Sequence, residues 1–191
     1  VPVTRLKEGE REKLLHLPDA LHRRVGYVLQ DTYLFSGTIA ENICMGTDTL
    51  DMETVKHASA VACFDGAVRE FKDEYETFVG ERGVTLSGGQ KQRCSIARML
   101  ATKPDIMIFD DSLSAVDSET DAAIRRALKR EFEGCTVILI SHRVTTLSHA
   151  DQIVVLDEGR VAEKGTHAEL VALGGIYSRV CSMQGRDDVV S

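Results

Sequence analysis

The sequence has 191 residues, enough for one ordinary domain or for a core that carries a small inserted subdomain. It is 43% hydrophobic and 28% charged, which excludes long disorder and leaves enough apolar material for a core. The formal charge of −7, with both signs interspersed, argues against a nucleic-acid partner, because such proteins usually show a basic face. The longest apolar runs are strand-sized, far short of the roughly 20 residues of a membrane span.

Strand-like apolar runs alternate with amphipathic helical patterns along the chain. In chain order the pattern predicts a strand over 25–29, a helix over 39–45, one or two helices over 51–71, a loop at 80–83, a helix over 87–100, a strand over 106–109, a helix from 118 to about 131, a strand over 136–140, a hairpin of 152–156 and 160–164, and short helices over 166–173 and 175–183. Ser87 is expected to cap its helix, with Gln90 at the capping-box spacing, and Ser118 with Asp121 is expected to open the next one.

Near-continuous apolar strands that alternate with helices indicate an α/β fold with a parallel sheet covered on both faces. In such sheets the residues that handle ligands sit at the carboxyl ends of the strands. Four polar residues fall at a predicted strand end, namely Gln30, Asp110, Asp111 and His142. This coincidence predicts a ligand site along one edge of the sheet.

The most specific stretch is LSGGQ, which consists of Leu86, Ser87, Gly88, Gly89 and Gln90. Two glycines at a helix start let the backbone approach an anion, whose charge the free amides and the helix dipole favour. A Ser-Gly-Gly start by itself could be a plain capped helix. The whole string resembles the signature of ABC-type ATPases, and this resemblance implies binding to the γ-phosphate of ATP held by the opposite subunit.

The strand that closes on Asp110 resembles the Walker B strand of the same family, whose last carboxylate meets Mg²⁺ through water. Asp111 stands where the family carries the glutamate that activates the attacking water. Aspartate is one methylene shorter, and an error of about 1 Å in placing a catalytic group can cost roughly a hundredfold. We therefore expect slow or absent hydrolysis at this site, although a relayed water remains the alternative. Asp117 ends a Ser-Ala-Val-Asp run that resembles the D-loop, which implies a role at the nucleotide.

Two more strand-end residues match the family by position. His142 resembles the switch histidine, which contacts the γ-phosphate and the water, although a histidine at a strand end is often only a polar exit from a core. Gln30 resembles the Q-loop glutamine, whose amide can reach Mg²⁺ and the water. The resemblance thus implies ATP and Mg²⁺ as cofactors.

The stretch from Asp31 to Ile43 resembles exporter-type ABC subunits, in which this region docks a coupling helix of the transmembrane domain. The loop from Gly80 to Gly83 resembles a second exporter contact, with a solvated ion pair as the alternative. The resemblance implies a place at the cytoplasmic face of the cell membrane, through a transmembrane domain that this chain lacks. It also implies a second nucleotide-binding domain as partner, expected to be non-identical because LSGGQ is intact while Asp111 is not the usual glutamate.

The P-loop motif G-x-x-x-x-G-K-[ST] is absent from the sequence, so no amide cradle for the α- and β-phosphates is expected. The expected fold is a P-loop NTPase (RecA-like) core with an inserted ABC α-helical subdomain, lacking its N-terminal strands and P-loop, and the simplest explanation is a chain cut at its amino end. The expected divisions are 1–30 as a core remnant, 31–103 as the helical subdomain, 104–183 as the core with Walker B, and 184–191 as a loose tail.

Three functions fit the motifs. The first is the ATP-hydrolysing motor domain of an exporter, inactive as this chain alone. The second is a non-catalytic regulatory subunit that completes the partner's ATP site through LSGGQ. The third, an ABC ATPase of DNA repair or translation, is disfavoured because residues 31–86 hold no heptad run for the coiled coil of the repair proteins.

Overall fold

The computed structural model describes residues 24–80, 85–112 and 116–187. They belong to two compact units, Val1–Ile138 and Leu139–Ser191, which are described separately. The boundary between the units lies inside the strand β5 (Thr136–Ile140). None of the helices in the described ranges is long and apolar enough to span a bilayer.

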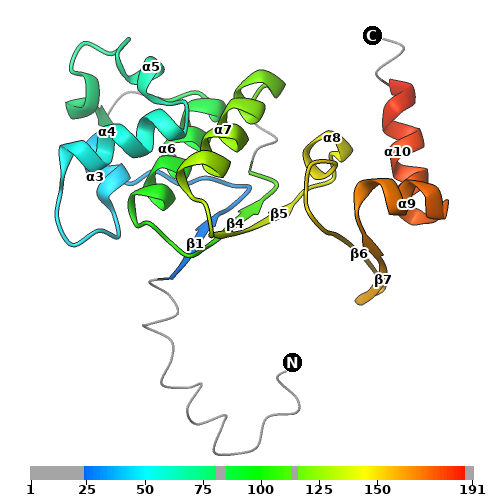
Figure 1. Cartoon of the computed structure of the whole chain (residues 1–191). Helices are drawn as coiled ribbons and strands as arrows, with labels where there is room; N and C mark the ends of the chain where they lie inside the picture. Colours follow the sequence, from blue (N-terminus) through cyan, green and yellow to red (C-terminus); the bar gives the residue numbers. More distant parts are fainter. Residues whose placement is uncertain (1–23, 81–84, 113–115, 188–191) are drawn as a thin grey trace, which may run out of the picture. The chain divides into compact units, whose positions relative to one another are not determined.

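A three-stranded sheet in the order β1-β4-β5 organises the first unit (Figure 1). Strand β1 (Val25–Val28) pairs in parallel with β4 (Ile106–Asp110), with Val28 opposite Phe109. The expected strands at 25–29, 106–109 and 136–140 are all present, and the parallel α/β class is confirmed. Adjacent parallel strands bring their carboxyl ends to one edge of the sheet.

Only one face of the described sheet is well covered. Val28, Met107 and Phe109 are buried, whereas Tyr27 on the other side of β1 is 48% exposed. Strand β5, expected to be buried, exposes most of its apolar side chains: Val137, Ile138 and Ile140. The expectation of cover on both faces is therefore wrong for these residues. An apolar run predicts a strand, but its burial depends on neighbours that local periodicity does not specify.

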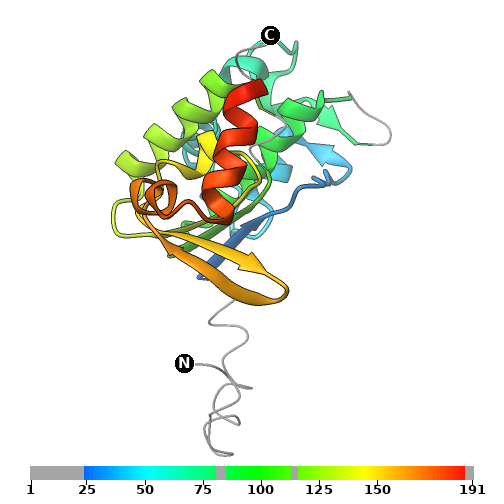
Figure 2. The ribbon, with the colours of Figure 1, turned by 90° about the vertical axis from the view of Figure 1, so that its right-hand side faces the viewer.

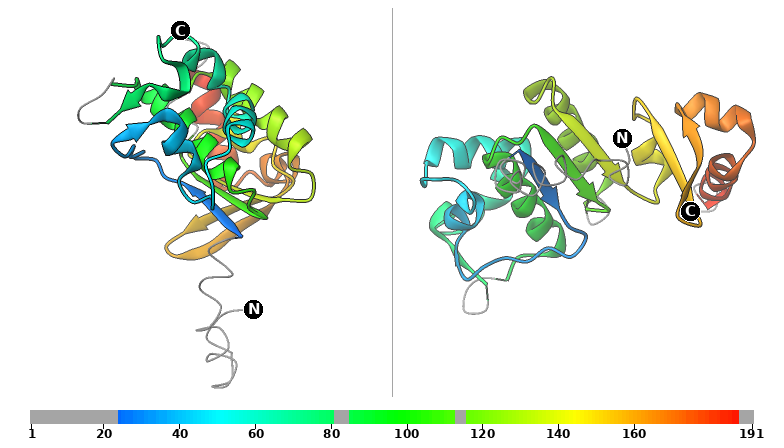
Figure 3. Two further views of the ribbon diagram at one scale, coloured as in Figure 1. Left: turned by 90° about the vertical axis from the view of Figure 1, so that its left-hand side faces the viewer. Right: turned by 90° about the horizontal axis from the view of Figure 1, so that it is seen from below.

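Helices pack around α6 in the first unit, as Figure 3 shows from two further sides. The elements in chain order are β2 (Gly37–Thr38), α3 (Ile39–Cys44), α4 (Met52–Val61), α5 (Asp65–Val68), the 3-10 helix η2 (Glu74–Glu76), β3 (Phe78–Val79), α6 (Gly88–Ala101) and α7 (Ser118–Glu131). Helices α3 and α4 both contact α6, and their apolar faces bury Ile39, Ile43 and Val55 with Ile96 of α6. This burial, at about 25 cal/mol per Å² of apolar surface, is the main stabilising contribution.

The helix starts follow capping chemistry. Ser87 caps α6, its Oγ accepting from the Gln90 amide while the Gln90 side chain accepts from the Ser87 amide, as predicted. Helix α7, however, is capped by Asp117, whose carboxylate accepts from the Thr120 amide at 2.8 Å. Helix α7 thus begins at Ser118, as predicted, but its cap is Asp117 and not Ser118. Aspartate and serine are comparable caps, so sequence alone does not choose between neighbours.

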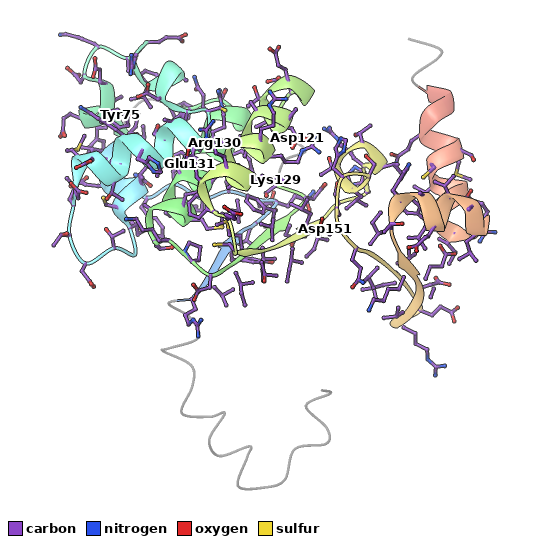
Figure 4. The ribbon with its side chains drawn as sticks, in the orientation of Figure 1. Tyr75, Asp121, Lys129, Arg130, Glu131 and Asp151 are labelled. Atoms are coloured by element: carbon purple, nitrogen blue, oxygen red, sulfur yellow. The ribbon has the colours of Figure 1, made fainter. Side chains whose placement is uncertain are left out.

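Helix α7 is tied to α4 at its C-terminal end. Glu131 accepts from Arg130 Nε at 2.8 Å and lies 3.4 Å from His57 of α4 (Figure 4 labels Arg130 and Glu131). Near the start of α7, Asp121 forms an ion pair at 3.0 Å with Arg125, one turn later. Asp121 is 7% exposed, and its carboxylate serves this ion pair and not the helix cap.

The second unit is a hairpin with three helices, α8 (Val144–Leu147), α9 (His167–Leu173) and α10 (Ile176–Asp187) (Figure 2). Strands β6 (Ile153–Asp157) and β7 (Arg160–Gly165) pair antiparallel, as predicted. Their turn needs left-handed backbone at Glu158 (φ 47°) and Gly159 (φ 74°), the geometry that matches hairpin twist. Helix α10 runs to Asp187, so the predicted loose tail is wrong for residues 184–187. Residues 188–191 lie outside the described residues.

Gly26→Ala is expected to destabilise the chain by about 2 kcal/mol, because overpacking a dense core forces its neighbours apart. A Cβ at Gly26 would stand 2.4 Å from Met99 Cγ and 2.7 Å from the rigid ring of Pro104. Gly66→Ala in α5 is the matched control, since a Cβ there meets none of the described atoms within 4 Å. Urea unfolding of the full chain measures both, and equal free energies of unfolding for the two variants would contradict the packing argument.

Candidate functional site

Gln30 and Asp110 emerge at the same edge of the sheet. Gln30 follows β1 by two residues and is exposed, whereas Asp110 is the last residue of β4 and is half-buried. Tyr27 Oη donates to Asp110 Oδ2 at 3.3 Å. Partial desolvation, and then the Asp110 charge and this hydrogen bond, raise the pKa of Tyr27, which keeps the phenol a donor. The structure therefore adds Tyr27, which the sequence analysis missed, to the predicted edge.

Asp111 turns the chain directly after β4. Its φ of 43° lies in the left-handed region, where aspartate and asparagine are several-fold enriched among non-glycine residues. The backbone here therefore favours aspartate over glutamate. The next residue, Ser112, is 1% exposed, and the residues 113–115 of the predicted D-loop lie outside the described residues.

The signature lies at the N-terminus of the 14-residue helix α6. Ser87 and Gly88 are exposed and Leu86 is buried, so the helix start is anchored by Leu86 and open at its tip. A Cβ at Gly88 would meet no atom of the described residues within 4 Å. The capping bonds use Ser87 Oγ and Gln90 Oε1 as acceptors, which leaves the hydroxyl hydrogen and the amide NH₂ able to donate. The tip thus combines free donors, open space and a helix dipole, which together favour an anion.

Both carboxylate oxygens of Asp117 accept hydrogen bonds from Thr120. Oδ1 accepts from the Thr120 amide at 2.8 Å, and Oδ2 accepts from Thr120 Oγ1 at 2.7 Å. Both bonds lower the pKa of Asp117, and the bond from the Thr120 amide has the larger effect. The described structure therefore assigns Asp117 a helix cap, and a role at a nucleotide stays a prediction.

Asp117→Asn is expected to lower the thermal midpoint at neutral pH and to have little effect in acid. A carboxyl whose folded-state pKa is depressed stabilises the fold above its unfolded pKa of about 4 and loses that effect as the pH falls through the folded value. Asparagine can still cap, but it carries no charge toward the helix dipole. Thermal unfolding of the full chain at pH 7 and pH 3 measures this, and a wild-type-to-variant difference that is equal at both would refute it.

His142 belongs to the second unit, where it follows β5 by two residues. Its side chain is exposed, and its backbone carbonyl accepts from Gln184 Nε2 of α10. The amide of Val144, two residues after His142, donates to Oε1 of the same glutamine at 2.8 Å. Gln184 thus holds the loop that carries His142, whose role as a switch stays a prediction.

The two segments expected to face a membrane domain lie together in the first unit. Strand β2, within the stretch from Asp31 to Ile43, pairs antiparallel with β3, and Gly80 follows β3 directly. Gly80 has a φ of 105°, and a Cβ there would stand 2.9 Å from Ser36 Cα. Residues 81–84 lie outside the described residues. Sequence analysis named the two segments separately, and their pairing comes from the structure.

Three buried or half-buried polar residues that sequence analysis missed hold this region: Asn42, Gln92 and Arg98. Asn42 and Gln92 are 1% and 2% exposed. Their sequence context is an ordinary amphipathic helix, so the only signal was a polar residue on an apolar face.

Among the described residues, no three His, Cys, Asp or Glu side chains come together in a group that could hold a metal ion. A Mg²⁺ bound with a nucleotide usually takes one or two carboxylates, phosphate oxygens and waters. One half-buried carboxylate, Asp110, beside the exposed Gln30 fits that need. Such an edge does not suit a metal held by protein ligands alone.

Residues 7–114 match the protein family described as ABC transporter. The chain belongs to the ABC transporter family. The ABC transporter ATP-binding protein YknU of Bacillus subtilis is 44% identical over 167 residues, which are 87% of this chain and 28% of that protein. A probable multidrug resistance ABC transporter ATP-binding/permease protein of the same organism, YheI, is 48% identical over 159 residues, 83% and 27% of the two chains.

A solved structure gives the same result for the fold. The structure of a bacterial Atm1-family ABC exporter with ATP bound matches with a TM-score of 0.83 and 38% identity, over 87% of this chain and 29% of that one. The predicted family and the exporter-type ATP-binding domain are thereby confirmed. This ABC domain spans less than a third of the length of the relatives it matches.

Proposed function

We propose that the complete protein is an ATP-driven exporter and that this ABC domain completes the ATP site of a second nucleotide-binding domain through LSGGQ. The observation that carries the proposal is the open, capped N-terminus of α6, with Ser87 and Gly88 exposed and room above Gly88. A tip with this much room among the described residues can receive a phosphate from a partner. ATP-driven closure of the two domains would then move the membrane partner.

The strand-edge residues would serve this domain's own ATP site. Asp110 and Gln30 would hold Mg²⁺, which supplies charge neutralisation at the β- and γ-phosphates when bound. Asp111 would orient the attacking water, His142 would contact the γ-phosphate, and Asp117 would face the nucleotide from the D-loop. Hydrolysis by these 191 residues alone is not expected, since their sequence contains no P-loop.

The partners follow from the same arrangement. The stretch from Asp31 to Ile43, which contains β2, and the loop from Gly80 to Gly83, which follows β3, would dock coupling helices of a transmembrane domain. In that arrangement the domain would lie at the cytoplasmic face of the membrane, and the helical subdomain at 31–103 would lie between the core and that partner. The aspartate at position 111 supports a non-identical second subunit that carries the usual glutamate. The net charge of −7 argues against a nucleic-acid partner.

A second candidate function is favoured by Asp111 alone. The domain would then regulate the exporter by completing the partner's site, without useful hydrolysis at its own.

Gly88→Asp in the complete protein tests the main proposal. The carboxylate would stand where the γ-phosphate of the partner's ATP belongs, so the ATPase rate at that site should fall by at least about a hundredfold, in line with loss of a positioned donor group. The fold should not suffer, because a Cβ there meets no described atom within 4 Å and an acidic residue is favourable in the first turn of a helix.

Gly88→Ala is the matched control, since it adds the Cβ without charge and should retain most activity. An unchanged thermal midpoint together with lost ATPase supports the proposal. ATPase and transport rates of Gly88→Asp equal to those of the wild type would contradict the proposal.

A further inference from the structure

The signature helix α6 holds the backbone on both sides of Gln30. Gln92 donates from Nε2 to the Leu29 carbonyl at 3.3 Å. Arg98, less than two turns further along α6, donates from Nη1 to the Tyr33 carbonyl at 3.0 Å. The stretch between these carbonyls forms no helix or strand, so its position depends on such side-chain contacts.

Arg98 also fixes the segment that we assign to the membrane partner. Its Nε donates to the Asn42 carbonyl at 2.8 Å, and its Nη2 donates to Asn42 Oδ1 at 2.7 Å. The same Oδ1 accepts from the Phe35 amide at 3.0 Å, while Asn42 Nδ2 donates to the Phe35 carbonyl at 2.9 Å. The guanidinium lies 5.5 Å from the centre of the Phe35 ring, within cation–π range. One side chain of α6 thus contacts Tyr33, Phe35 and Asn42, which all lie in the stretch from Asp31 to Ile43, the docking segment.

These contacts require an arginine. Burial lowers the pKa of Arg98, and none of the ion pairs among the described residues includes it. Its charge is balanced by carbonyl oxygens and an aromatic face, through a planar fork of five N–H donors. Lysine carries one compact ammonium and cannot reach the Tyr33 and Asn42 carbonyls from both sides of a fork.

We propose that Gln92 and Arg98 are positioning residues that make Gln30 follow the signature helix. When the tip of α6 moves onto the partner's nucleotide, Leu29 and Tyr33 move with the helix, and Gln30 moves at this domain's own ATP site. One helix thereby couples the two ATP sites to each other. The identity of these sites rests on the proposed function, whereas the positioning contacts do not.

Hydrogen exchange of the backbone amides at 30–38, read by mass spectrometry in the complete protein, tests the positioning directly. Gln92→Met and Arg98→Lys should each speed exchange in this segment by at least about fivefold without nucleotide, since freed segments open more often. With MgATP, the wild type should gain protection there and both variants should gain less. Two variants at separate positions keep the test decisive if one of them fails to fold.

Arg93→Met is the matched control on the same helix. Arg93 also donates to two backbone carbonyls, Gly89 at 3.2 Å and Cys63 at 2.8 Å, and neither of these lies near Gln30. Equal acceleration by Arg93→Met, or unchanged exchange in Gln92→Met and Arg98→Lys, would overturn the proposal.

ATPase kinetics separate positioning from mere stability. Gln92→Met should lower kcat about tenfold with KM for ATP within about twofold, the pattern of an interaction that acts in the transition state. A rise in KM with unchanged kcat would contradict it. A wild-type protein without any ATPase would refute the proposed function, and the exchange comparison without nucleotide would still decide the positioning role.

Discussion

Asp111→Glu is expected to raise ATP hydrolysis at this domain's own site by about ten- to a hundredfold, since about 1 Å in the placement of a catalytic group is worth up to that much. The longer side chain would bring a carboxylate to the position from which the family's glutamate orients water. The rate should be measured in the complete protein on a Gly88→Asp background, which silences the partner's site and leaves this one. A gain without loss of transport favours a regulatory role for the native site.

The left-handed backbone at Asp111 sets a counter-effect. Glutamate adopts a φ of 43° less favourably than aspartate does, so the free energy of unfolding of the variant should be lower by about 1 kcal/mol. Asp111→Asn is the matched control, because it keeps the conformational preference and removes the charge. If Asp111→Glu and wild type turn over ATP equally fast on the silenced background, the aspartate already works through a relayed water.

Asn42→Leu is expected to lower the free energy of unfolding by about 3 kcal/mol, because it leaves several buried polar groups without partners. The near-isosteric leucine removes the bonds to the Phe35 amide and carbonyl, to the Thr38 carbonyl at 3.0 Å, and to Arg98 Nη2. Core volume is kept, so the loss reports hydrogen bonding and not a cavity. Urea unfolding of the full chain, with the slope checked for constancy, gives the value.

Asn42→Asp separates the acceptor from the donor side of the same residue. It keeps an oxygen for the Phe35 amide and for Arg98, and loses the two donated bonds, so about half of the leucine effect is expected. A loss below about 1 kcal/mol for Asn42→Leu would show that water replaces these contacts, and that Asn42 does not hold the docking segment.

Sequence alone was enough wherever chemistry is local. The LSGGQ string and the Ser87–Gln90 capping box depend on residues within one helical turn, and both the family and the cap are confirmed. Asp110 at a strand end follows from an apolar run and its polar exit, which the period of a strand makes visible. The hairpin turn at Glu158 and Gly159 is equally local.

Only the tertiary structure decided what depends on distant residues. The exposure of β5 depends on which elements pack against it, and a hydrophobic run does not encode that. Arg98 and Asn42 lie 56 residues apart, and their contact, like the one between Gln92 and Leu29, arises because α6 packs beside β1 and α3. Local periodicity places each side chain on a face, whereas the partner it meets there is set by the packing of the whole unit.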